Sequence, residues 1–319
     1  MSLKTNCKNF KSRSCPNNSL TFIDKYKFEV FYDRKYFGDN TKIYHCDKCD
    51  ICFIDPMPSN ETLDNFYKHI YRAQNRPHSI HDIYPPGILE SRLELLTKNI
   101  DFSKIKNILE IGPGNGQFGK LIKSKYDTDI YCIEPDISSK KILSKNGFKF
   151  FENNNNIKFD LILSFHSLEH FALVDSFFNL FEKTLKEGSI IFVEVPNNPI
   201  KKWFKTGERH YDSPHTLFFS KKSLEKIFTE RNYKLIFSDY NGMSIEEDFK
   251  HMAEEKKQFE NWRPNKIYFI KEIKKIIKFF IPSSILKIRQ KLSEDKSQEA
   301  SYFKYGDDNS WVLRILAKR

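Results

Sequence analysis

The chain has 319 residues, of which 39% are hydrophobic, and it carries a formal net charge of +11. Its amino-terminal residues are polar and basic without an apolar run, so we expect neither a secretory signal peptide nor, further on, a membrane-spanning helix. A cytoplasmic protein with a substantial hydrophobic core is expected, whose six cysteines are thiols or metal ligands rather than disulfides.

The amino-terminal part contains a Cys-x-x-Cys pair, Cys46 and Cys49. This spacing lets two thiolates face one zinc ion, but a zinc site of four ligands needs a second pair. The further candidate ligands are Cys7 and Cys15, with Cys52 and His45 as substitutes. We predict a cysteine-rich module over residues 1–60 and leave two readings open, one with zinc bound and one free of metal.

A helical linker or lid is expected over residues 61–100, with Ser59 or Asn60 as the N-cap of its first helix. The run from Asn107 to Phe118 then gives the most informative pattern, because an apolar strand breaks into a glycine-rich turn that opens a helix. This arrangement predicts a site for a nucleotide-type ligand. Its flexible positions are Gly112, Gly114 and Gly116.

Two common ligands are disfavoured at this turn. A dinucleotide fingerprint requires a third glycine where Gln117 stands, and Pro113 separates the first two glycines. A P-loop requires a Gly-Lys-Ser/Thr sequence after the turn, which the chain lacks. About 20 residues past the glycines, the strand that starts at Asp129 ends in Glu134, a carboxylate placed to accept from ribose hydroxyls.

Later apolar runs predict the remaining strands of an α/β sheet. The expected strands are Asp160 to Phe165, Gly188 to Pro196, Tyr233 to Asp239 and Ser310 to Ala317. With the glycine run they resemble class I S-adenosylmethionine-dependent methyltransferases over roughly residues 100 to 240 and the last ten. The resemblance implies a Rossmann-like, doubly wound sheet of seven strands whose last two form an antiparallel edge pair, spanning residues 101–241 and 309–319.

The same resemblance implies S-adenosyl-L-methionine as cofactor. Its expected contacts come from the glycine turn, from the acid after the second strand and from the end of the fourth strand. The implied cofactor residues are Glu110, Gly112, Gly114, Asn115, Gly116, Glu134, Ser164 and Phe165.

The cysteine pair, the apolar stretch after it and the following helix resemble a group of sugar methyltransferases with an amino-terminal zinc module. Zinc by this resemblance would be held by Cys7, Cys15, Cys46 and Cys49. Two departures weaken the zinc prediction: Asp50 replaces a glycine that usually follows the second knuckle cysteine, and the first pair is widely spaced.

Histidines are the candidate catalytic residues, because a methyltransferase must remove a proton from its acceptor near neutral pH. His166 and His170 follow the fourth strand, and His215 matches a family histidine that precedes an aromatic-Ser pair, here ending in Ser220. Each has an alternative role in ordering its loop. Sugar C-methyltransferases of this group carry Glu before that histidine and Tyr two residues earlier, whereas this chain has Pro214 and Asp212. We therefore predict O-methylation with His215 as general base.

A helical insertion is expected over residues 242–308. Its amphipathic part, residues 266–292, places isoleucines and phenylalanines on one face and lysines on the other. We favour packing on the domain, as a roof over the substrate cleft or as a homodimer contact, over peripheral binding to an anionic membrane.

Three functions follow as candidates. The leading one is an O-methyltransferase for a small-molecule sugar or glycan precursor. An RNA methyltransferase is second, although nucleic acid is disfavoured because Ser164 to Ser167 stands where Asn/Asp-Pro-Pro-Tyr would mark an amino-base enzyme. A non-catalytic binding protein is third, and the intact Glu110, glycines and Glu134 argue against it.

Overall fold

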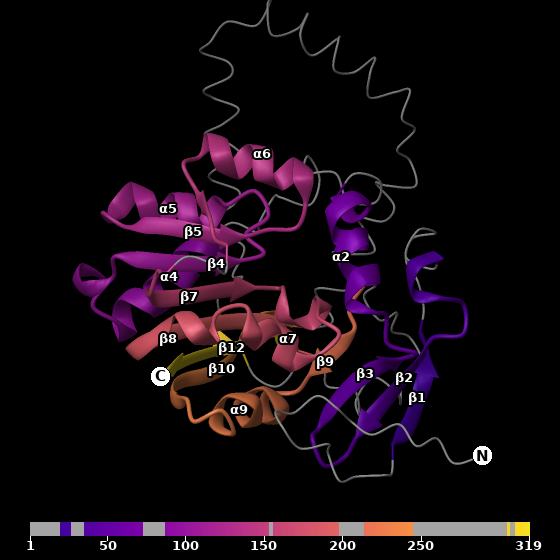
Figure 1. Ribbon diagram of the computed structural model, residues 1–319. Coiled ribbons are helices and arrows are strands. Elements are labelled where there is room, and N and C mark those ends of the chain that lie inside the picture. Colours follow the sequence, from indigo (N-terminus) through magenta and orange to yellow (C-terminus); the bar gives the residue numbers. More distant parts are fainter. Residues whose placement is uncertain are drawn as a thin grey trace, which may run out of the picture.

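The computed structural model describes residues 20–26, 35–72, 87–152, 156–197, 214–244, 305–306 and 310–319. Two sheets organise these residues (Figure 1). Cys7, Cys15 and the amphipathic segment 266–292 lie outside the described residues. Within the described part, no helix is long and apolar enough to cross a membrane.

The large sheet has the strand order β11-β10-β12-β8-β7-β4-β5-β6. The strands are β4 (Asn107–Ile111), β5 (Asp129–Ile133), β6 (Lys149–Phe150), β7 (Phe159–Phe165), β8 (Leu185–Pro196), β10 (Lys234–Ser244), β11 (Tyr305–Gly306) and β12 (Ser310–Lys318). The five strands from β8 to β6 are parallel, whereas β12 pairs antiparallel with both β8 and β10. The mostly parallel sheet of seven strands is thus confirmed, and the short β11 adds an eighth strand beyond β10.

Helices cover both faces of the large sheet, as its parallel strands require. These helices are α4 (Ile88–Asn99), α5 (Gln117–Lys125), α6 (Ile137–Lys145), α7 (Val174–Asn179) and α9 (Lys221–Thr229), with 3-10 turns η2 (Phe102–Lys104), η3 (Leu168–His170) and η4 (Glu182–Thr184). A further helix, α2 (Asn60–His69), packs instead with residues of a second, small sheet. Neighbouring residues of β4 show the alternation: Ile108 packs with α4, α5 and α6, and Leu109 packs with α7 and α9.

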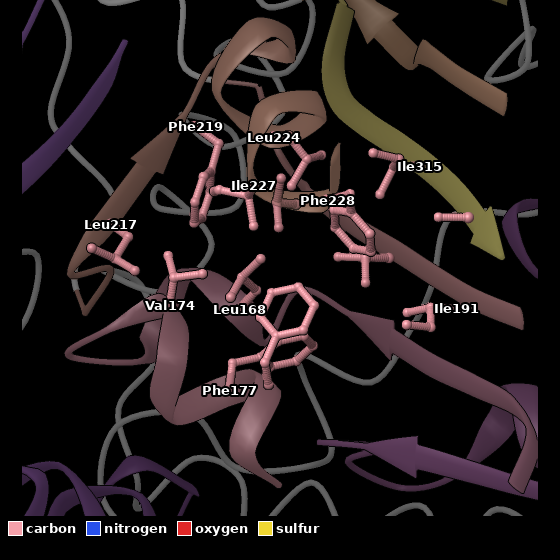
Figure 2. Packing of buried hydrophobic residues seen from close by; sticks show 14 of the residues in the cluster. Leu168, Val174, Phe177, Ile191, Leu217, Phe219, Leu224, Ile227, Phe228 and Ile315 are labelled. Atoms are coloured by element: carbon pink, nitrogen blue, oxygen red, sulfur yellow. The ribbon is translucent and has the colours of Figure 1, made fainter. Parts of the chain in front are cut away.

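The face under α7 and α9 is filled by aromatic and branched side chains (Figure 2). Phe177 of α7, Phe228 of α9 and Ile191 of β8 are all fully buried there. Burying one such side chain contributes roughly 1.5 to 3 kcal/mol to folding. Helix α9 begins where the sequence predicts, because Ser220 caps it and shares a capping box with Ser223.

A second, antiparallel sheet has the order β1-β2-β3-β9 and lies beside the large one (Figure 1). Its strands are β1 (Thr21–Lys25), β2 (Lys42–Cys46), β3 (Ile51–Asp55) and β9 (Leu217–Phe219). The fourth strand comes from the chain far beyond residue 60, since Cys52 pairs with Phe218. Side chains on one face of this sheet pack into the core under α9, so the amino-terminal segment shares that hydrophobic core with the large sheet.

Candidate functional site

The glycine turn after β4 is a tight, left-handed segment. Gly112, Gly114 and Gly116 have φ of 66°, 58° and 74°. A Cβ at Gly112 would collide with Ser167 Oγ, and a Cβ at Gly114 would lie 3.2 Å from Arg72 Nη2. The glycines are needed both for backbone conformation and for close approach. Asn115 accepts from the Gln117 backbone nitrogen at 3.3 Å, at the start of α5.

Glu134 follows β5 and folds back onto this turn. Its Oε2 accepts from the Gly114 backbone nitrogen at 3.0 Å, and its Oε1 accepts from the Asp136 backbone nitrogen at 2.9 Å. Burial raises the pKa of Glu134 to about 7, against the lowering effect of these two donors. Each oxygen has a second lone pair, so the carboxylate can still accept from a pair of ligand hydroxyls.

Glu110 lies on β4 beneath the turn and is 2% exposed. Its Oε2 has no hydrogen-bond partner among the described residues. Burial raises the pKa of Glu110 to about 8, with Glu134 adding to the effect. A buried, unbonded carboxyl oxygen next to a glycine cradle fits a site that is completed by a polar ligand.

Ser164 and Phe165, the predicted cofactor residues of the fourth strand, are the last two residues of β7. Ser164 is fully buried in β7, and Phe165 packs edge-on against Phe118 and Phe192 in the core. Arg92 lies over the Phe165 ring at 4.1 Å. The assignment of Ser164 and Phe165 to the cofactor site stays a prediction.

The segment after β7 contacts the glycine turn and carries the predicted histidines. Ser167 donates to the Ile111 carbonyl at 3.1 Å, beside Gly112. His166 has a φ of 53°, and its backbone nitrogen donates to the Glu194 carbonyl at 2.9 Å. This geometry places the segment 166–170 at the carboxyl end of the sheet, next to the turn, where ligands of open α/β sheets bind.

The structure brings all three predicted histidines to one carboxylate, Glu169. Oε1 of Glu169 lies 3.6 Å from His166 Nδ1, 4.0 Å from His170 Nε2 and 3.9 Å from His215 Nε2. The rings of His170 and His215 are 4.8 Å apart, in an edge-on arrangement. His215 reaches this place because Thr216 bonds through its backbone nitrogen to the Glu169 carbonyl at 2.8 Å.

Two members of this cluster were not predicted from the sequence. Glu169 is fully buried, and the one signal that could have found it is its place before His170. Tyr67 of α2 is the second: its hydroxyl lies 2.8 Å from His170 Nδ1. No local pattern marks Tyr67, since the contact joins residues far apart in the chain.

A buried triad of charged side chains, Glu194, Arg314 and Arg92, lies on the strands and helix next to this cluster. Both oxygens of Glu194, on β8, face arginines: Arg314 Nε lies 2.5 Å from Oε1, and Arg92 Nε lies 2.7 Å from Oε2. Burial alone would raise the pKa of Glu194, but Arg314 and Arg92 outweigh it and hold this pKa below its ordinary value. The triad ties α4 and β12 to the strand next to β7.

Cys46 is the last residue of β2, and Cys49 lies in the turn between β2 and β3. Cys46 and Cys49 are buried in the core under α9, whereas Cys52 packs in the cluster on the opposite face of the small sheet. Cys52 therefore cannot share an ion with the pair. His45 is also engaged, with its nitrogens 3.0 and 3.2 Å from Asp47 and Asp50 carboxylate oxygens. A zinc site at this pair stays a prediction that needs Cys7 and Cys15.

The comparison with protein families matches residues 84–237 to a model described as "Methyltransferase domain". The sequence has no match among the curated proteins compared with it. The matched range runs from before α4 into β10 and contains the glycine turn, Glu134 and the histidine cluster.

Solved structures similar to this chain include a Haemonchus contortus phosphoethanolamine N-methyltransferase 2 in complex with S-adenosyl-L-methionine, at 14% identity and a TM-score of 0.47. That match covers 84% of this chain and 62% of the other, so this chain spans under two thirds of that protein. A Thermotoga maritima protein described as a possible histamine N-methyltransferase matches at 14% identity, covering 80% and 99%, with a TM-score of 0.46. Residues 84–237 are thus similar to a methyltransferase domain, and they contain the glycine turn, Glu134 and Glu169.

Proposed function

We propose that the protein methylates a hydroxyl of a small-molecule sugar or glycan precursor, with His215 as general base. The observation that carries this proposal is the gathering of His166, His170 and His215 around buried Glu169, in the segment that contacts the glycine turn. A histidine paired with a carboxylate suits removal of a hydroxyl proton near neutral pH.

S-adenosylmethionine, when bound, supplies an activated methyl group on a sulfonium. The glycine turn and Glu134 would hold its adenosine part. The chain's remaining task is to place the acceptor oxygen in line and to take its proton. His215 accepts that proton, and Glu169, at 3.9 Å from Nε2, stabilises the imidazolium that results.

Tyr67 and His170 complete the arrangement. The 2.8 Å contact between Tyr67 Oη and His170 Nδ1 fixes the His170 ring beside His215. Tyr26 anchors the loop from the other side, since its hydroxyl donates to the His215 carbonyl at 2.7 Å. The acceptor is proposed as a sugar because this loop resembles that of sugar methyltransferases while Pro214 replaces the glutamate of the C-methylating ones.

The test is a screen of nucleotide sugars and free glycans with radiolabelled S-adenosylmethionine, followed by variants at the base. His215→Ala should lower kcat by about 100-fold or more while leaving binding of S-adenosylhomocysteine unchanged. His69→Ala, an exposed histidine of α2, is the matched control. Unchanged kcat in His215→Ala would contradict the base assignment, and transfer to amines alone would contradict O-methylation.

A further inference from the structure

Glu169 is buried in an unusual way for a carboxylate. Its side chain is fully inaccessible, and within the described part of the chain neither oxygen has a hydrogen-bond partner. The facing nitrogens of His166, His170 and His215 lie 3.6 to 4.0 Å from Oε1, beyond hydrogen-bond length. A buried carboxylate without bonds is costly, so something else is expected to satisfy it.

Glu169, His170 and His215 each offer one possible ligand atom, and these three atoms lie within 4.8 Å of one another. We propose that these three side chains form a binding site for a divalent transition-metal ion. Ligand atoms about 2.1 Å from one ion lie roughly 3 to 3.5 Å apart, so closing the site requires movements of about 1 Å or less.

The donor set selects the class of ion. Two imidazole nitrogens and one carboxylate oxygen suit Zn²⁺, Fe²⁺ or Co²⁺, whereas Mg²⁺ and Ca²⁺ prefer oxygen ligands alone. Three protein ligands also leave at least one coordination position open to another group. Within the described part of the chain, these three residues are the group of histidines, cysteines and acids that meets the geometry of a metal site.

Outer contacts hold the three ligands in place. Tyr67 engages Nδ1 of His170 at 2.8 Å and thereby directs Nε2 toward Glu169, the kind of orienting bond that metal-binding histidines usually have. Thr216 bonds to the Glu169 carbonyl through both its backbone nitrogen and its hydroxyl, at 2.8 and 3.0 Å. The ligands on η3 and on the loop before β9 are therefore fixed to each other.

The site itself rests on this geometry, but its role rests on the proposed function. A bound ion would occupy His215 Nε2 and so replace this imidazole as the activating group. The acceptor hydroxyl would fill the open position, and the ion would lower its pKa. The proton released from the coordinated hydroxyl would pass to solvent, because the ion lowers the pKa of the hydroxyl but does not itself accept a proton.

Metal binding can be tested without any acceptor. Tag-free full-length protein, stripped with a chelator, would be titrated with Co²⁺ and followed by visible absorption and calorimetry. We expect wild type to bind one more Co²⁺ ion per chain than either single variant, Glu169→Gln or His170→Ala. The exposed residues Glu90 and His69 provide matched controls, and Glu90→Gln and His69→Ala should keep that ion.

Three further readings make the result decisive. Tyr67→Phe should lower the affinity for Co²⁺ by about 10-fold, because it removes a bond that orients His170 but removes none of the metal ligands. Cobalt held by cysteines would show thiolate charge-transfer absorption and would persist in Glu169→Gln. Equal numbers of bound ions in wild type and Glu169→Gln, or no bound ion in wild type, would overturn the proposal. Because the titration contains no acceptor, either result would leave the proposed role of His215 as general base unaffected. If circular dichroism shows that Glu169→Gln is unfolded, the number of Co²⁺ ions bound by His170→Ala is compared with wild type instead.

Discussion

The Oε2 atom of Glu134 accepts a 3.0 Å hydrogen bond from the backbone nitrogen of Gly114, which precedes it by 20 residues. This bond joins the end of β5 to the turn after β4, at the carboxyl ends of two neighbouring parallel strands. Arg72 lies beside both residues and lowers the pKa of Glu134, opposing the larger effect of burial. Contacts within the chain therefore hold Glu134 against the glycine turn, where we propose that the cofactor binds.

The stability of the protein should depend on pH through Glu110. Burial raises the pKa of Glu110 to about 8 in the folded chain, above its ordinary value of 4.5. Between these two values the folded chain keeps a proton that the unfolded chain releases, so the free energy of unfolding falls as the pH rises.

Urea unfolding at pH 5.5 and pH 8 measures this effect. The free energy of unfolding of wild type should fall by roughly a few kcal/mol between the two pH values. It should fall clearly less in Glu110→Gln, because glutamine does not titrate. Glu152→Gln, at an exposed position, controls for the loss of one charge. Equal losses in wild type and Glu110→Gln would contradict the assignment.

Gly112 should not tolerate a side chain. Gly112→Ala carries the cost of a positive φ, about 1 to 2 kcal/mol, and adds a collision with Ser167 Oγ. Gly188→Ala is the control, because Gly188 also has a positive φ but the nearest atom to its Cβ would be Lys318 Cε at 3.8 Å. Thermal unfolding should show a larger loss for Gly112→Ala, with weaker binding of S-adenosylhomocysteine in that variant alone. Similar losses and equal binding would refute the steric role of this turn.

Tyr67 should act on the reaction and not on the cofactor. Tyr67→Phe removes the hydroxyl beside His170 Nδ1 and keeps the ring that packs on Phe66 and His170. We expect kcat to fall by about 10-fold, the effect of one lost orienting bond, while affinity for S-adenosylhomocysteine is unchanged. Tyr126→Phe, which stacks on Phe102, serves as the control. A kcat equal to wild type would show that the contact has no role in transfer.

The sequence was informative wherever the signal is local. The turn after β4, the carboxylate at Glu134 and the cap at Ser220 each depend on a few neighbouring residues, and their strand and helix boundaries agree with the structure within a few positions. The mostly parallel sheet of seven strands was expected from the resemblance to class I methyltransferases, and the structure agrees with it.

Contacts between segments far apart in the sequence could not be predicted from it. The pairing of Cys52 with Phe218 places β9 in a second sheet, and nothing near either residue predicts it. The convergence of Tyr67, Glu169 and His215 likewise depends on three separate segments. The cysteine pair was identified, but its burial and the opposite orientation of Cys52 depend on how β2 and β3 pack, which residue spacing alone does not determine.

The most direct test of the account is a calorimetric titration of the full chain with S-adenosylhomocysteine, using wild type, Glu134→Ala and the exposed control Glu152→Ala. We predict binding by wild type and Glu152→Ala, and affinity weaker by about 10-fold or more in Glu134→Ala, because a carboxylate that accepts from ribose hydroxyls is lost. Unaltered affinity in Glu134→Ala would contradict the placement of the cofactor at this turn, and an absence of binding by folded wild type would contradict the account of the cofactor site as a whole.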